Sequence, residues 1–269
     1  MVRKPIGLSV ISVLHYFKLI FRSVLFLTAL VSYLIHRMSQ TSPFGEMASH
    51  PILLAVIGIV FAIEMILRFF PSRLESMGCQ KQFRQNFRPT EVQKVPSIHR
   101  GVWMVLLFWI LLNGGIGALY LTGVIDVGVM ILISLAYSVC DMICILFFCP
   151  FQTWMMKNKC CGSCRIYNWD YAMMFTPFFF VPHVFTYSLL ALSLLLLLYW
   201  EIAAYRHPER FSEVTNESLS CRYCEEKLCH HKKQLRHFLK KNKDSLLLKG
   251  NAIVTSTKEK IKEIGKKTK

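Results

Sequence analysis

Two short groups of cysteines are the residues of this sequence that most clearly suggest chemistry. These cysteines, with the histidines that follow the second group, are Cys160, Cys161, Cys164, Cys221, Cys224, Cys229, His230 and His231. Each group contains two cysteines separated by two residues, a spacing that lets two thiolates converge on one metal ion about 2.3 Å away. The six cysteines, with His230 or His231 as a nitrogen ligand, therefore form a candidate ligand pool for zinc or an iron–sulfur cluster.

Three interpretations of these cysteines compete. Cations next to the groups, such as Lys159 and Arg165, would stabilise thiolates and favour a metal or iron–sulfur centre. The same environment also suits a dithiol redox pair. The third interpretation is separate structural zinc sites or thiols without activity. A centre shared by both groups requires them to lie on one face of a membrane, because an apolar segment separates them.

Two acidic residues, Glu64 and Asp141, fall inside apolar runs of the sequence. A charge at that depth costs several kcal/mol unless it faces a partner, so each acid is a candidate for an ion or proton pathway. The alternative is a hydrogen bond between helices, with nearby cysteines acting as small apolar residues. Asp141, Cys144 and Gln152 are predicted to share one helical face.

These residues must be positioned by membrane helices. The chain is 54% hydrophobic with a mean hydropathy of +0.40, and its apolar residues gather in runs long enough to cross about 30 Å of hydrocarbon. We expect an all-α, polytopic helical membrane protein with four to six membrane segments. A membrane domain over residues 1–204 would precede a basic, cysteine-containing tail over 205–269. The expected segments are 19–36, 51–70, 102–125, 127–150, a short broken segment 171–182, and 183–204.

The position of the tail depends on the last apolar stretch. Pro177 and Pro182 interrupt it and favour a broken segment followed by one span, which brings the tail back to the cytoplasmic face. From Arg206 onward the tail carries 17 Lys and Arg against eight acids, in agreement with a cytoplasmic position. A single long crossing would instead leave the tail outside and favour disulfides in the second cysteine group. The triplet that begins at Asn216 matches a glycosylation sequon, which we interpret as a chance match.

The formal net charge of +16 lies mostly in the segments between the apolar runs and in the tail. This placement predicts contact with anionic lipid headgroups and no binding of nucleic acid. We expect a multi-pass protein of the cell membrane with a cysteine-ligated centre at the cytoplasmic face. That centre would serve membrane-linked electron transfer or metal sensing, with a redox or membrane-protein partner. The alternatives are a small ion or metal transporter that uses Glu64 and Asp141, or a non-enzymatic scaffold or assembly factor. The sequence leaves open whether the protein is an enzyme.

Overall fold

The computed structural model describes residues 10–39, 51–71, 77–91, 100–158 and 164–220. Within these ranges every regular element is a helix, and the strand-like pairing there is an isolated antiparallel bridge between Pro89 and Asn216. The predicted all-α class is therefore confirmed for the part of the chain that the structure describes. Most of the basic tail, from residue 221 onward, lies outside that part.

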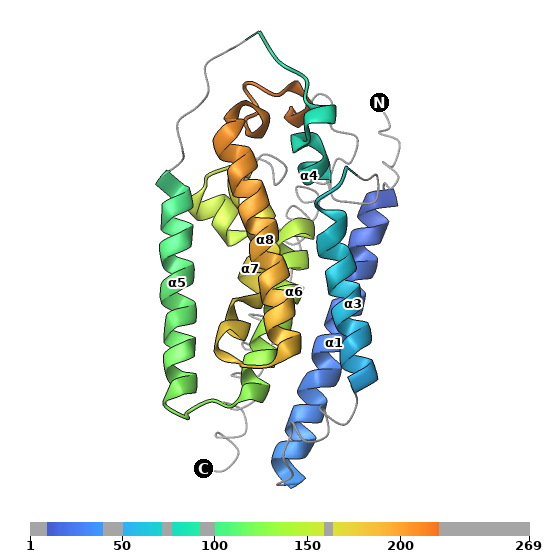
Figure 1. Ribbon diagram of the computed structural model, residues 1–269, viewed down its shortest axis with the longest axis vertical. Coiled ribbons are helices and arrows are strands. Elements are labelled where there is room, and N and C mark those ends of the chain that lie inside the picture. Colours follow the sequence, from blue (N-terminus) through green and yellow to red (C-terminus); the bar gives the residue numbers. More distant parts are fainter. Residues whose placement is uncertain (1–9, 40–50, 72–76, 92–99, 159–163, 221–269) are drawn as a thin grey trace, which may run out of the picture. The chain divides into compact units, whose positions relative to one another are not determined.

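Four of the described helices are long and apolar enough to cross a membrane. They are α1 (Val10–Ser39), α5 (Arg100–Leu121), α6 (Val127–Leu146) and α8 (Val184–Arg206), and Figure 1 shows them as the long elements of the bundle. A fifth apolar helix, α3 (Pro51–Leu67), is shorter. Large apolar side chains are exposed along these helices, as expected for surfaces in contact with lipid. How many of the segments cross a membrane remains a prediction.

The helix α1 packs mainly along α6. A hydrogen bond fixes one end of this pair, because the Tyr33 hydroxyl of α1 donates to the Asp126 carboxylate at 3.0 Å. Asp126 also caps α6 by accepting a hydrogen bond from the Val129 amide at 2.9 Å. The turn from α5 into α6 contains Gly123, whose φ of 73° favours a residue without a side chain. Local turn chemistry thus sets where α6 begins.

The helix α6 ends at Leu146, before the expected end of this segment at residue 150. Pro150 accounts for the difference, since proline lacks an amide hydrogen and disfavours helical geometry in the residue before it. The chain then forms η2 (Phe151–Met155), a π-helical turn that packs against α5. The end of α6 and this turn form two sides of the cavity described below.

The stretch after residue 169 is a short broken segment followed by one long helix. It consists of α7 (Asp170–Phe175) and η4 (Thr176–Phe180), after which the chain turns at Pro182 and enters α8. The His183 side chain caps α8, and the Thr186 hydroxyl donates to the Val181 carbonyl at 2.7 Å. Both α7 and η4 pack against α8, so the chain doubles back along itself here.

The ring of Phe180 in η4 packs directly on Gly117 of α5, where any side chain would overlap it. Gly114, one turn earlier on the same helix, has open space instead. Small residues therefore permit a close helix contact at Gly117.

A layer of short helices covers one end of the long helices in Figure 1. Its elements are α4 (Met77–Gln82), η1 (Arg84–Asn86), η3 (Arg165–Trp169), η5 (Pro208–Phe211) and η6 (Glu217–Leu219). Their apolar centre is the Trp200 ring of α8, which lies 5.1 Å from the Phe83 ring and 6.2 Å from the Phe211 ring, measured between centroids. Segments far apart in the sequence thus meet in this layer, where the flanks of both cysteine groups are found.

Candidate functional site

Arg22 of α1 is the centre of a buried network of charges. Its guanidinium donates to the Glu64 carboxylate of α3 at 2.8 Å and to the Asp141 carboxylate of α6 at 3.1 Å. A third hydrogen bond goes to the Ser138 carbonyl at 3.2 Å. The Arg22 side chain is only 2% exposed, so these partners replace almost all of its hydration. One guanidinium therefore connects three apolar helices.

Glu64 has two further partners besides Arg22. The Lys18 ammonium, one helical turn before Arg22 on α1, lies 3.3 Å from the other oxygen of the carboxylate. The Tyr171 hydroxyl of α7 donates to Glu64 at 2.8 Å. Such multiple pairing is what a charge inside an apolar bundle requires.

A second ion pair lies beside the first network. Arg68, just after α3, binds Asp170 at the start of α7 through two contacts of 2.6 and 2.8 Å. The Arg68 guanidinium lies 4.6 Å from the centre of the Tyr171 ring, and that of Arg22 lies 5.9 Å from it. Tyr171 thus links both ion pairs, and we call the whole set the charge network: Lys18, Arg22, Glu64, Arg68, Asp141, Asp170 and Tyr171. Its three cations balance its three acids.

Glu64 and Asp141 stand out in the sequence as acids within apolar runs, whereas their cations, Lys18, Arg22 and Arg68, do not. The helical spacing held a usable signal, since Lys18 and Arg22, and likewise Glu64 and Arg68, are four residues apart. That spacing puts each pair on one face of its helix, but it does not identify which other helix packs against that face.

His15 of α1 lies near the charge network and is 4% exposed. Its electrostatic neighbours include Lys18, Arg22, Arg68 and Glu64. Among the described residues neither ring nitrogen has a hydrogen-bond partner, which is unusual for a buried imidazole.

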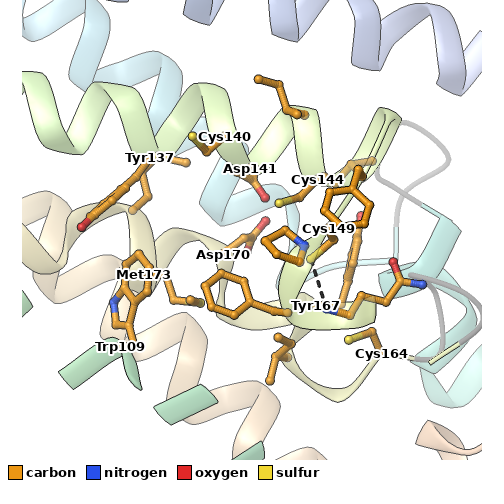
Figure 2. Close-up of a pocket in the computed structure, with 18 residues that line it drawn as sticks. Trp109, Tyr137, Cys140, Asp141, Cys144, Cys149, Cys164, Tyr167, Asp170 and Met173 are labelled. Atoms are coloured by element: carbon orange, nitrogen blue, oxygen red, sulfur yellow. Dashed lines mark hydrogen bonds between the residues drawn. The ribbon is translucent and has the colours of Figure 1, made fainter. Parts of the chain in front are cut away.

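A cavity of about 460 Å³ lies next to the charge network, between α5, the end of α6, η2, η3 and α7. Figure 2 shows the carboxylates of Asp141 and Asp170 pointing toward one another at this cavity, with the Cys144 sulfur beside them. Most of the remaining wall is apolar and aromatic. Asp141, Cys144 and Gln152 all line this cavity, but α6 ends at Leu146 and Gln152 belongs to η2, so the single continuous helical face expected from the spacing is not formed.

Four cysteines line the cavity: Cys140, Cys144, Cys149 and Cys164. The Cys149 sulfur accepts a hydrogen bond from the Gln152 amide at 3.4 Å, drawn as the dashed line in Figure 2. Over the described ranges no three His, Cys, Asp or Glu side chains are arranged to hold a metal ion.

Of the predicted metal ligands, the structure describes Cys164 alone, which is buried. The others lie outside the described residues: Cys160, Cys161, Cys221, Cys224, Cys229 and His230.

The segments that flank the two cysteine groups bind the same short helix, α4. After Cys164, the Asn168 amide donates to the Gln82 side chain at 2.8 Å, and both side chains are almost fully buried. Before Cys221, the Asn216 amide donates to the Lys81 carbonyl at 3.0 Å. The two attachment points are consecutive residues of α4.

Further contacts hold each flank in place. Arg165 and Trp169 both bind the Glu201 carboxylate of α8, at 2.7 and 2.6 Å. On the other flank, Ser218 donates to the Asn86 carbonyl at 2.5 Å. Asn216 itself is fully buried and its amide also donates to the Arg210 carbonyl, so the sequon is closed to glycosylation in this fold.

Comparison with protein-family models, with curated proteins and with solved structures finds no match.

Proposed function

We propose that this chain is a multi-pass membrane protein that carries a cysteine-ligated zinc or iron–sulfur centre at one membrane face. The observation that carries the proposal is the attachment of both cysteine flanks to α4, through Asn168 to Gln82 and through Asn216 to Lys81. Two cysteine groups can bind one metal centre only if the chain segments that carry them lie close together. Cys164, the last cysteine of the first group, and Ser220, the residue before the second group, belong to such segments.

The chemistry of the ligand pool agrees with this proposal. A tetrahedral thiolate site commonly takes two ligands from each of two C-x2-C elements, and nearby cations offset the charge of the thiolates. Arg222 lies within the second group, and Arg165, which follows Cys164 directly, is paired with Glu201. Such a centre would serve membrane-linked electron transfer or metal sensing on the cytoplasmic side.

The test is metal analysis of the anaerobically purified full-length chain, with a visible spectrum. Iron with acid-labile sulfide supports electron transfer, and one zinc per chain supports sensing or a structural site. Cys161→Ser and Cys224→Ser should each remove most of the metal, because losing one ligand opens the whole site. Cys140→Ser, a change on α6 at a cysteine that belongs to neither group, is the control and should keep the metal. Retention of about half the metal in each of the first two variants would contradict a shared centre.

A second proposal is a small ion or metal transporter that uses Glu64 and Asp141. One observation favours it: Asp141 belongs to the charge network and also lines the cavity. The same ion pairs equally suit a purely structural role. Metal accumulation in cells carrying the Glu64→Gln/Asp141→Asn double variant separates the two, because normal accumulation with normal protein levels would remove the support for transport.

A further inference from the structure

We propose that the cavity beside Asp141 and Asp170 binds the ring of a lipid-soluble quinol, an inference that rests on the proposed electron-transfer function. The cavity is formed entirely by described residues of α5, α6, η2, η3 and α7 and the loops between them. Its volume of about 460 Å³ falls in the usual range for sites of small ligands.

The charges around the cavity favour a neutral ligand. Asp141 is paired with Arg22 and Asp170 with Arg68, and neither guanidinium lines the cavity. A bound cation would therefore meet carboxylates whose charge Arg22 and Arg68 already neutralise. A bound anion, such as a fatty acid, would meet the carboxylate oxygens first. Both kinds of charged ligand would lose hydration without gaining a free counter-charge.

The shape of the wall favours a flat ring. Five aromatic side chains line the cavity: Trp109, Tyr137, Phe148, Phe151 and Tyr167. Trp109 is close to two of these rings, with its centroid 4.8 Å from that of Tyr137 and 6.1 Å from that of Phe151. Aromatic groups arranged at such spacings accept another ring by stacked or edge contacts. The volume suits one substituted ring with the start of a chain, and leaves the rest of the chain to the lipid.

The polar groups of the cavity select the reduced form of the ligand. The Asp141 and Asp170 carboxylates, which Figure 2 shows facing one another, are acceptors when ionised. One hydroxyl of a quinol can donate to this pair of carboxylates, whereas the carbonyl oxygens of a quinone can only accept. A quinone has no hydroxyl to donate to the carboxylates. Its carbonyl oxygens would lie against the carboxylate oxygens, which also carry negative charge. The site should therefore distinguish two molecules of almost the same shape.

The position of the cavity agrees with the proposed centre. Cys164, the last cysteine of the first group, lies on the cavity wall, so a bound ring would lie next to the segment that carries the centre. On α6, Cys140 lines the cavity and is itself exposed, so the cavity is open beside this residue. A ligand dissolved in lipid can thus reach the cavity from the side.

The test uses the full-length, metal-loaded protein in lipid nanodiscs, titrated anaerobically with decylubiquinol and with decylubiquinone by calorimetry. We expect the quinol to bind at least tenfold more tightly than the quinone. Met173→Trp, which fills the cavity, should weaken quinol binding at least tenfold. The matched control is Met104→Trp, the same change on an exposed position of α5, which should leave binding unchanged. Equal affinity for both forms, equal binding of decanol, or normal binding by Met173→Trp would overturn the proposal.

A measurement on the unaltered protein covers the case in which Met173→Trp does not fold. Bound decylubiquinol should slow the reaction of a lipid-soluble maleimide with Cys140 at least fivefold, followed at that residue by peptide mass spectrometry. An unchanged rate with saturating quinol would overturn the proposal. Metal analysis of the same samples separates the quinol site from the metal centre. Quinol binding by metal-free Cys224→Ser protein would support the quinol site independently of the metal. Absence of quinol binding to metal-loaded protein would refute the quinol site and leave the metal centre standing.

Discussion

Arg22 of α1 and Glu64 of α3 form an ion pair of 2.8 Å between two predominantly apolar helices. Because Arg22 also binds Asp141 of α6, the position of each of these helices depends on the same guanidinium. Inside an apolar bundle such a group has few alternative partners, so the pairing selects one arrangement of α1, α3 and α6. The charge network thus determines how α1, α3 and α6 pack together. This role does not depend on any function of Asp141 at the cavity.

Replacing Arg22 with methionine should destabilise the bundle by about 3 kcal/mol or more, because two buried acids lose their shared cation. Thermal unfolding of the purified protein in detergent measures the effect. Arg37→Met, the same change at an exposed position of α1, should have little effect. Adding Glu64→Gln and Asp141→Asn to Arg22→Met should recover much of the lost stability. Equal melting temperatures for Arg22→Met and Arg37→Met would show that the network does not hold the helices.

Glu64→Gln should cost more stability than Asp141→Asn. Glu64 binds Lys18, Arg22 and Tyr171, so its neutralisation weakens three contacts, whereas Asp141 is paired with Arg22. Hydrogen bonds to charged groups contribute about 1.5–3 kcal/mol each, and the amide of glutamine keeps part of them. Chemical denaturation of the two variants in parallel gives the order, and the reverse order would contradict the assigned partners.

The positions of the helices could be predicted from the sequence much better than the side-chain contacts between them. Apolar runs and prolines are local signals, so the long helices and the break near Pro177 were visible without a structure. The pairing of Arg22 with Glu64 depends on which helices pack together, and no local pattern contains that information. Asp170 illustrates the same limit, because its partner is Arg68, 102 residues away in the sequence.

The topology prediction can be tested by labelling. Cys221, which lies outside the described residues, follows a segment bound to α4, and the linker that carries α4 is rich in Lys and Arg. Both should therefore be cytoplasmic. In intact cells a membrane-impermeant maleimide should label a cysteine introduced by Thr122→Cys, in the exposed turn between α5 and α6, and should label Cys221 only after lysis. Because both cysteine flanks bind α4, strong labelling of Cys221 in intact cells would put the α4 layer on the outer face and contradict the predicted cytoplasmic side of the centre.

The last prediction concerns Asn168, whose amide fixes the first cysteine flank to Gln82 of α4. Asn168→Leu keeps the approximate size of the side chain but leaves the buried Gln82 oxygen without its donor, at a cost of about 1–3 kcal/mol. If α4 aligns the two flanks for one centre, this variant should also lose most of its bound metal. The matched control is Asn113→Leu, which removes another buried amide, on α5, that donates to the Trp109 carbonyl at 3.0 Å.

The comparison of these two variants separates positioning from stability. Both should lower the melting temperature, because each removes a buried hydrogen bond. Asn113, however, lies on α5 and bonds to Trp109 and Tyr137, which belong to α5 and α6 and to neither cysteine flank. Metal content per folded protein should therefore fall in Asn168→Leu and stay at the wild-type value in Asn113→Leu. Excess metal should partly restore occupancy in Asn168→Leu, since its cysteines are intact and only their alignment is impaired. Full metal content in Asn168→Leu at limiting metal would mean that the flanks do not need α4 to form the centre.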